Sequence, residues 1–120
     1  MVEAAIIATD VELLRRVYAA FNAREVETVL AAMHPDVDWP NGMEGGRVLG
    51  TTAVRAYWRR QFETLVPQVE PVGFKQENDG RIAVTVHQVV HDIGGKLIVD
   101  QTLQHVYEIR DGLIRGMEIR

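Results

Sequence analysis

Hydrophobic residues recur every three or four positions in the first half of the chain and at every second position in the second half. The first spacing predicts amphipathic helices over residues 11–22, 26–33 and 53–65. Asp10 is a suitable N-cap for the first of these helices. Pro35 is expected to end the second, because the residue before a proline avoids helical geometry. The first half of the chain is therefore expected to be mainly helical.

Alternation of hydrophobic and polar positions predicts strands. The expected strands are residues 37–39, 47–49, 69–77, 81–92, 97–110 and 113–119. The first two are short and precede the third helix. Pro71 and Gly73 weaken the strand after the third helix, so it is expected to be bent or to lie at the edge of the sheet. Because consecutive strands follow the helices, the pattern predicts one α+β domain over residues 1–120, not repeated βαβ units.

A register for the two long strands follows if Gly94 and Gly95 form the turn between them. One ladder is then mostly apolar and is assigned to the core face: Val90–Val99, Gln88–Gln101, Val86–Leu103, Val84–His105 and Ile82–Tyr107. The opposite ladder is more polar and is assigned to the outer face: His91–Ile98, Val89–Asp100, His87–Thr102 and Thr85–Gln104.

The second hairpin, with Asp111 and Gly112 at its tip, brings the last strand against the core face. This register places Tyr107 opposite Gly116 and His105 opposite Glu118. The core face then carries several polar side chains among aliphatic ones, which is typical of a ligand pocket. Without partners, each buried polar group would cost several kcal/mol, so these groups are expected to meet one another, water or a ligand.

The pair of His105 and Glu118 is the sharpest candidate for chemistry. A carboxylate beside an imidazole fixes its tautomer and raises its basicity, which suits a general base near neutral pH. The same pair would also be explained as a structural contact that closes the sheet. A catalytic role for His105 and Glu118 is therefore a hypothesis beside a structural alternative.

Other polar and aromatic residues are candidates for ligand contact. They are Tyr18, Trp39, Asn41, Tyr57, Trp58, Gln88, Gln101 and Tyr107. The tyrosine hydroxyls could donate hydrogen bonds to a ligand oxygen, and the tryptophans could form an apolar wall or, for Trp39, a lid. Packing of the aromatic side chains in the core explains the same residues equally well.

Composition and charge exclude several classes of binding partner and chemistry. The net charge is −4, from 13 basic and 17 acidic residues, which argues against nucleic acid or an anionic membrane surface. The chain has no cysteine, so disulfides and thiolate chemistry are excluded. Residues 1–10 lack the features of a signal peptide, and a cytoplasmic protein is expected.

No metal or cofactor is expected. His87 and His91 lie four residues apart, but on a strand this spacing separates them by about 13 Å, too far to share one ion. With Asp100 they fit a polar surface between two subunits instead. No phosphate-binding glycine loop and no hydrolase or metalloprotease motif occurs in the sequence.

Several local sequences, in this order and spacing, resemble the nuclear-transport-factor-2-like (NTF2-like) superfamily, and most closely its SnoaL-like and ketosteroid-isomerase-like bacterial members. They are VYAAFNA at residues 17–23, MHPDVDW at 33–39, GTTAVRAYW at 50–58 and YEIRDGLI at 107–114. The resemblance implies a cone-shaped curved antiparallel sheet capped by three N-terminal helices, also described as a cystatin-like α+β roll. It further implies a deep pocket and a homodimer through the outer face of the sheet.

The resemblance does not carry over the steroid isomerase mechanism. Those enzymes use an aspartate base just before a proline, where this chain has Trp39. Their oxyanion-binding tyrosine matches Val17, with Tyr18 about 100° further round an ideal helix. Their protonated aspartic acid matches His105, or Gln104 if the alignment slips by one. Isomerisation by that mechanism is therefore not expected.

Three functions stay open on the sequence alone. The first is an isomerase, cyclase or dehydratase acting on a small apolar carbonyl or hydroxyl compound, with His105 as acid or base. The second is a binding protein that holds such a molecule without changing it. The third is a dimeric interaction module whose pocket is packed shut by Trp39, Tyr57 and Trp58.

Overall fold

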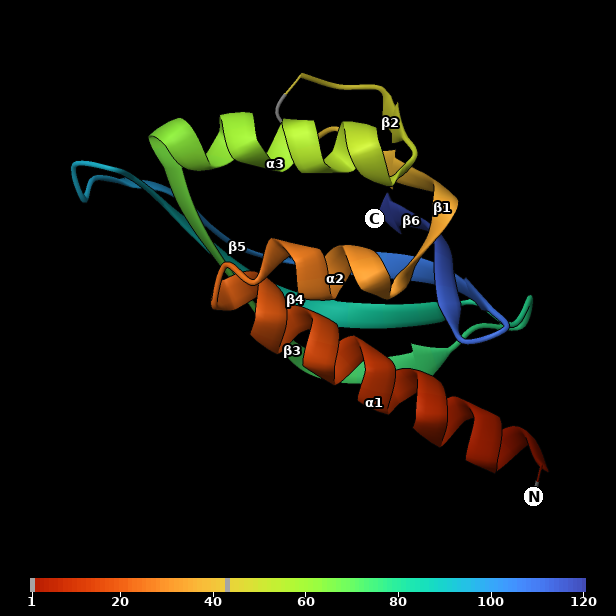
Figure 1. The fold of residues 1–120 in the computed structure, drawn as a ribbon. Helices are drawn as coiled ribbons and strands as arrows, with labels where there is room; N and C mark the ends of the chain where they lie inside the picture. Colours follow the sequence, from red (N-terminus) through yellow and green to blue (C-terminus); the bar gives the residue numbers. More distant parts are fainter. Residues whose placement is uncertain (1, 43) are drawn as a thin grey trace.

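The computed structural model of the protein describes residues 2–42 and 44–120. Within these residues, three helices and six strands follow one another in the order α1 Val2–Asn22, α2 Val26–Ala31, β1 Met33–Pro40, β2 Arg47–Leu49, α3 Thr51–Thr64, β3 Leu65–Gln76, β4 Ile82–Asp92, β5 Leu97–Arg110 and β6 Leu113–Ile119. Figure 1 shows the helices on one side of a curved sheet that does not close. The predicted α+β class and the cone-like arrangement are confirmed.

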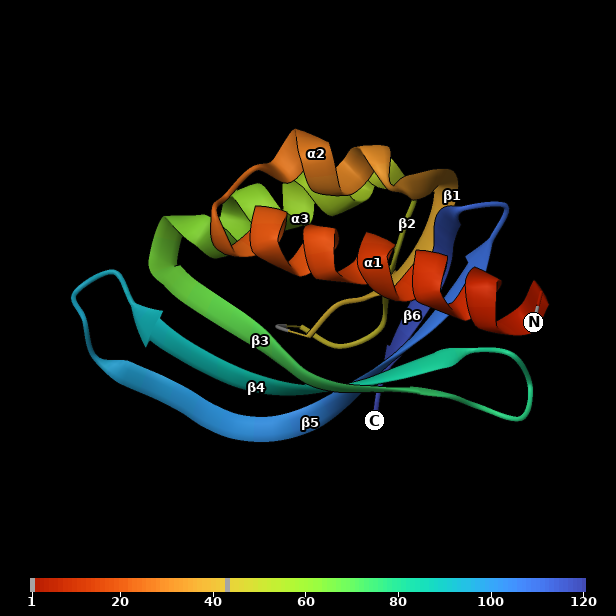
Figure 2. The same ribbon diagram turned by 90° about the horizontal axis from the view of Figure 1, so that it is seen from below.

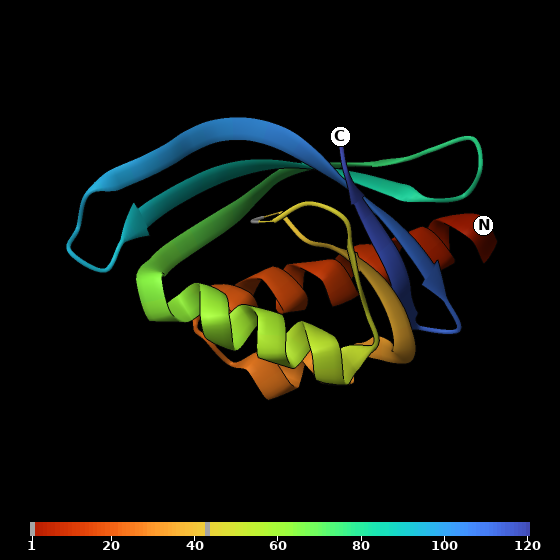
Figure 3. The same cartoon turned by 90° about the horizontal axis from the view of Figure 1, so that it is seen from above.

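The six strands form one sheet in the order β2-β1-β6-β5-β4-β3. The last four are consecutive antiparallel neighbours, as the alternating pattern predicted. β1 joins them by pairing parallel to β6, with Met33 opposite Ile114. Viewed from below and from above, β3 to β5 curve towards the side of the sheet on which α1 and α3 lie (Figures 2 and 3).

The core lies between the helices and the concave face of the sheet. Each helix contributes one apolar stripe, represented by Leu14, Val29 and Val54, all essentially inaccessible to solvent. Val37 of β1 and Ile114 of β6 are equally buried where these strands pair. This packing fixes α1 and α3 over the sheet.

All three helices differ from the predicted ranges, α3 only slightly, since it runs from Thr51 to Thr64. α1 begins at Val2, so Asp10 lies inside the helix and is not its N-cap. Residues 2–9 contain no proline or glycine, and nothing in them interrupts a helix. α2 ends at Ala31, and Met33 is a buried residue of β1.

β3 is the outermost strand at one edge of the sheet, as Pro71 and Gly73 predicted. Its pairing with β4 shifts between these two residues, which is a local bulge. At the end of α1, Asn22 bonds the backbone of Val69 in both directions, with its Nδ2 donating to the carbonyl oxygen and its Oδ1 accepting from the amide, both at 2.9 Å. This helix end is thereby tied to the edge strand.

None of the described helices is long and apolar enough to cross a membrane. A cytoplasmic location stays a prediction from the sequence.

Candidate functional site

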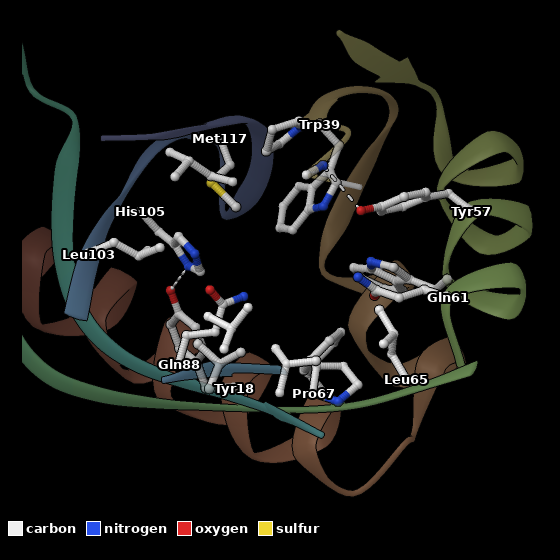
Figure 4. A pocket seen from close by; sticks show the side chains of 18 of the residues that line it. Tyr18, Trp39, Tyr57, Gln61, Leu65, Pro67, Gln88, Leu103, His105 and Met117 are labelled. Atoms are coloured by element: carbon white, nitrogen blue, oxygen red, sulfur yellow. Dashed lines mark hydrogen bonds between the residues drawn. The ribbon is translucent and has the colours of Figure 1, made fainter. Parts of the chain in front are cut away.

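A cavity of about 530 Å³ lies between the helices and the concave face of the sheet. Its wall is built from α1, α2, α3, from β1 and the turn after it, and from β3 to β6. Figure 4 shows Tyr18 and His105 on one side of the cavity, and Trp39, Tyr57 and Gln61 across from them. The volume is in the range of small-molecule sites.

A chain of hydrogen bonds joins three aromatic side chains at the buried end of the cavity. Tyr107 donates its hydroxyl proton to the hydroxyl oxygen of Tyr18 at 2.8 Å. The hydroxyl of Tyr18 is in turn 2.8 Å from Nδ1 of His105. All three side chains are at least nine-tenths buried, and the rings of Tyr18 and His105 are nearly parallel.

The protonation of His105 follows from its burial. Burial disfavours the charged imidazolium and lowers the pKa of His105 to about 4, so the ring is neutral near pH 7. Burial also raises the pKa of Tyr18 and Tyr107, so both keep their protons. Because Tyr18 already accepts from Tyr107, its own proton points to Nδ1, and the proton of the neutral imidazole sits on Nε2.

Nε2 of His105 is the polar atom that this arrangement offers to a ligand. It has no hydrogen-bond partner among the described residues. No fully buried side-chain nitrogen or oxygen of the described residues lacks a partner, so Nε2 reaches the surface of the cavity. The buried end of the cavity therefore presents an N–H donor.

Aromatic rings form a continuous wall next to this donor. Trp39 packs edge-on against Trp58, with ring centroids 5.7 Å apart, and Trp58 contacts Phe21 at 5.3 Å. The hydroxyl of Tyr57 accepts a hydrogen bond from the backbone of Gly42 at 3.1 Å. Trp39 is thus part of the wall.

Three glutamines add polar side chains to the cavity, besides Tyr57 and the indole N–H groups of Trp39 and Trp58. Nε2 of Gln101 donates to Oε1 of Gln88 at 2.9 Å across β4 and β5, and Gln101 is exposed to solvent. Gln61 of α3 is half-buried on the opposite wall. Among the described residues that line the cavity there is no aspartate, glutamate, lysine or arginine, so its only polar side chains are neutral at pH 7.

The predicted contact between His105 and Glu118 is wrong. A register shift between Glu108 and Ile109 places Glu118 opposite Val106, and His105 opposite Ile119. Since neighbouring residues of a strand point to opposite faces, Glu118 lies on the outer face, where it is exposed and pairs with Arg81 at 3.2 Å. The partner of His105 is Tyr18 instead.

The same shift corrects the predicted pairing of Tyr107 with Gly116, because Tyr107 is opposite Met117. Met117 thereby turns into the cavity. In the other hairpin, the core ladder from Ile82–Tyr107 to Val90–Val99 is as predicted. A second shift pairs His91 with Leu97, and Ile98 lines the cavity although it was assigned to the outer face.

Most of the predicted ligand residues do line the cavity: Tyr18, Trp39, Tyr57, Trp58, Gln88, Gln101 and Tyr107. Asn41 does not, because its Oδ1 accepts the backbone N–H of Glu44 and shapes the turn after β1. Gln61 was not among the predicted ligand residues. Its place beside Trp58 on the apolar stripe of α3 was the available signal.

His87 and Asp100 form a pair on the outer face, with Nε2 of His87 2.7 Å from the carboxylate. No group of three or more histidine and acidic side chains able to hold a metal ion occurs in the part of the chain that the structure describes. The residues present thus offer no recognisable metal centre there.

The model of the SnoaL-like domain family matches residues 14–117 of the chain. No curated protein matches the chain in sequence. Many solved structures share its fold at low sequence identity, and three of them illustrate the likeness.

An NTF2-like protein from Burkholderia pseudomallei is 28% identical with a TM-score of 0.81, over 93% of this chain and 89% of that one. TerC, co-crystallised with polyporic acid, is 28% identical with a TM-score of 0.80, over 93% and 90%. A Mycobacterium tuberculosis protein in complex with estradiol-17beta-hemisuccinate is 19% identical with a TM-score of 0.79, over 92% of each chain. The chain belongs to the SnoaL-like domain family of the NTF2-like superfamily.

Proposed function

We propose that the protein binds a small, largely apolar molecule through a carbonyl oxygen held by Nε2–H of His105. The observation that carries this proposal is the combination of a cavity whose described lining residues include no charged side chain and the buried, neutral imidazole N–H of His105 facing into it. A buried donor favours a ligand that supplies an acceptor, because otherwise its hydrogen bond is lost on desolvation. A carbonyl oxygen supplies this acceptor without bringing a charge into an apolar site.

Two structural relatives support a ligand of this kind. TerC was co-crystallised with polyporic acid, and the M. tuberculosis protein holds a steroid ester. Both compounds are mainly apolar ring systems that carry oxygen at their edges. The aromatic wall of Trp39 and Trp58 is suited to packing against flat rings.

The two tryptophans of the chain both line the cavity, so intrinsic fluorescence reports on its occupancy. We expect 4-acetylbiphenyl to quench this fluorescence saturably and to bind more tightly than 4-ethylbiphenyl, which lacks the oxygen. One hydrogen bond predicts a preference of about fivefold, and His105→Leu should remove it. Equal affinity for the two compounds, or no saturable quenching by either, would contradict the proposal.

A second candidate function is catalysis on such a carbonyl compound, as in an isomerase, cyclase or dehydratase. The hydrogen-bond chain from Tyr107 through Tyr18 favours it, because it fixes the tautomer of His105 that donates to a developing oxyanion. When the C–H bond next to the carbonyl breaks, its electron pair moves to the carbonyl oxygen and the proton passes to water. A neutral imidazole can polarise a carbonyl in this way.

Deuterium exchange tests this step directly. In D2O the methyl group of 4-acetylbiphenyl should take up deuterium faster with the wild-type protein than with His105→Leu, as followed by NMR. The control is Gln68→Leu, an exposed residue of β3 outside the cavity. Equal exchange rates with the wild type and His105→Leu would leave binding alone as the function.

We also propose that two copies associate through the outer face of the sheet. All three helices lie on the concave side, so this face is uncovered in one copy (Figure 2). Thr102 is exposed at its centre, next to the pair of His87 and Asp100. Thr102→Glu should halve the molecular mass measured by light scattering, because it places a charge in the interface. The control is Thr52→Glu, at an exposed residue of α3, which should leave the mass unchanged. A monomeric wild-type protein would refute the proposal.

A further inference from the structure

The cavity has two polar ends, which lie two same-face residue pairs apart along β4 and β5. The first is the N–H of His105 beside Tyr18 and Tyr107. The second is the pair of Gln88 and Gln101 near the tip of the β4–β5 hairpin. Between them on the same face lies the pair of Val86 and Leu103, which is apolar.

The spacing of the two ends follows from the strand. His105 and Gln101 are both on β5, four residues apart and on the same face. At a rise of 3.3 Å per residue, their backbone positions are separated by about 13 Å. A ligand that reaches both ends must therefore be elongated, with polar groups on the order of 10 Å apart once side-chain reach is allowed for.

The two ends also differ in what they offer. His105 presents one donor, because its Nδ1 is occupied by Tyr18. In the glutamine pair, one N–H of Gln101 and one lone pair of Gln88 are used in their mutual bond. The NH2 group of Gln88 and the carbonyl oxygen of Gln101 remain, so this end provides both donors and an acceptor.

The two ends of the cavity differ in solvent exposure. His105 is 7% exposed, whereas Gln101 is exposed and Ile98, closer to the tip of the hairpin, is 49% exposed. Gln61 on α3 adds a third amide to the wall away from His105. The buried end thus suits a group that only accepts hydrogen bonds, and the outer end suits one that can also donate.

We propose that the ligand carries a carbonyl at the end held by His105 and a hydroxyl at the far end of an apolar body two rings long, bound by Gln88 and Gln101. This inference rests on the proposed function, since it assumes that the carbonyl meets His105. It adds the length of the ligand and the chemistry of its second end.

A matched set of compounds tests the length and the second group separately. 4-Acetyl-4′-hydroxybiphenyl should bind about fivefold more tightly than 4-acetylbiphenyl, the gain of one hydrogen bond to the glutamines. On one ring the hydroxyl is too close to the carbonyl, so 4-hydroxyacetophenone should gain nothing over acetophenone. Affinities are read from the fluorescence of the two tryptophans.

Variants show which residues cause the tighter binding of the hydroxylated ketone. Gln88→Leu and Gln101→Leu should each remove the gain from the hydroxyl. His105→Leu should weaken both biphenyl ketones equally. Gln68→Leu, the same substitution on the exposed side of β3, is the control and should change neither.

The outcomes separate this inference from the proposed function. If 4-acetylbiphenyl binds through His105 but the hydroxyl adds nothing, or its gain survives in both glutamine variants, the second polar end is refuted and the first remains. If neither ketone depends on His105, the proposed function fails and the inference fails with it. A gain with 4-hydroxyacetophenone would refute the two-ring length.

Discussion

His105 is a buried histidine whose hydrogen-bond partner is a tyrosine rather than a carboxylate. A carboxylate partner would have favoured the imidazolium and made the residue a base. Burial favours the neutral ring, and because Tyr18 donates to Nδ1, the remaining ring proton is on Nε2. The residue is therefore suited to donating a hydrogen bond near neutral pH.

The lowered pKa of His105 makes stability depend on pH. In the unfolded chain the ring takes up a proton near pH 6.5, whereas in the folded protein it does so only near pH 4. The stabilising contribution is therefore complete above pH 6.5 and is lost as the pH falls towards 4. Over this interval we expect the free energy of unfolding to decrease by about 3 kcal/mol.

Urea denaturation at pH 7, 5.5 and 4.5 measures this decrease. His105→Gln replaces the imidazole by an amide that does not titrate, and it leaves the three less buried histidines in place. Its unfolding free energy should vary much less over this range. An equal pH dependence in the wild type and His105→Gln would show that His105 is not the group responsible.

Tyr18 and Tyr107 should differ in what their hydroxyls contribute. Tyr18→Phe removes the central oxygen of the chain and leaves both Nδ1 of His105 and the hydroxyl of Tyr107 without a partner. We expect it to lower the unfolding free energy by about 2–4 kcal/mol. Tyr107→Phe breaks one bond and leaves the contact to His105 intact, so a loss of about 1 kcal/mol is expected.

Thermal or urea unfolding of the two variants gives the comparison. A larger loss in Tyr107→Phe than in Tyr18→Phe would contradict this order of the hydrogen bonds.

At the level of elements, the sequence predicted most of the sheet because its signals were local. Alternation and the Gly94-Gly95 turn fixed the pairing of His105 with Val84 and of Gln88 with Gln101. The shift between Glu108 and Ile109 leaves Arg115 of β6 without an opposite residue, and the neighbouring Gly116 was its only sequence signal, because an isolated glycine inside a strand indicates a bulge. One extra residue there moved Glu118 to the other face and removed the predicted catalytic pair.

The start of α3 depends on a backbone conformation that only glycine adopts readily. Gly50 precedes the helix with φ 86° and ψ 154°, and a Cβ there would lie 3.3 Å from the carbonyl oxygen of Pro35. Gly50→Ala should therefore lower the unfolding free energy by about 1–3 kcal/mol. Trp58 and Gln61 are on this helix, so ligand affinity should fall with it.

Gly73→Ala on β3 is the matched control, because a Cβ there meets Thr85 at an ordinary 4.0 Å and the residue has no positive φ. It should change stability by less than about 1 kcal/mol. Both variants can be compared by urea denaturation, and an equal loss would show that the conformation of Gly50 is not the cause.

For the whole molecule, membership of the family could be predicted from four short sequences, and the cavity follows from it. The identity of its polar centre could not. That centre joins Tyr18 to His105 and Tyr107, which are more than 80 positions further along the chain. Their contact depends on the bend of the sheet under α1. Tyr18 was expected to face away from the matching position, yet both Val17 and Tyr18 line the cavity.

The edge of the sheet at β3 leaves few N–H groups for pairing with another strand. The amide of Val69 bonds Asn22, so it points away from β4, and by alternation residues 65, 67 and 71 share this direction. Residues 67 and 71 are prolines, which have no N–H, and the amide of Leu65 bonds Gln61. From Leu65 to Pro71 the outward donors are thus all absent or occupied.

Removing these features should make the protein prone to aggregate. The double variant Asn22→Ala/Pro71→Thr frees two neighbouring N–H groups on the edge. We expect it to form thioflavin-positive aggregates at concentrations where the wild type stays clear. Asn22→Ala alone loses the same bonds to Val69 but keeps Pro71, and so separates a loss of stability from an opened edge.

Asn22 and the prolines of β3 therefore restrict how copies of this protein can meet. An open edge allows strand addition, which has no natural end and produces fibres. When two copies join through the same face about a two-fold axis, that face is buried in both copies, and no further copy can bind to it. Because the outward N–H groups of residues 65–71 are absent or occupied, growth into a continuous sheet is blocked at this edge, and the closed pair proposed above is an assembly that does not need it.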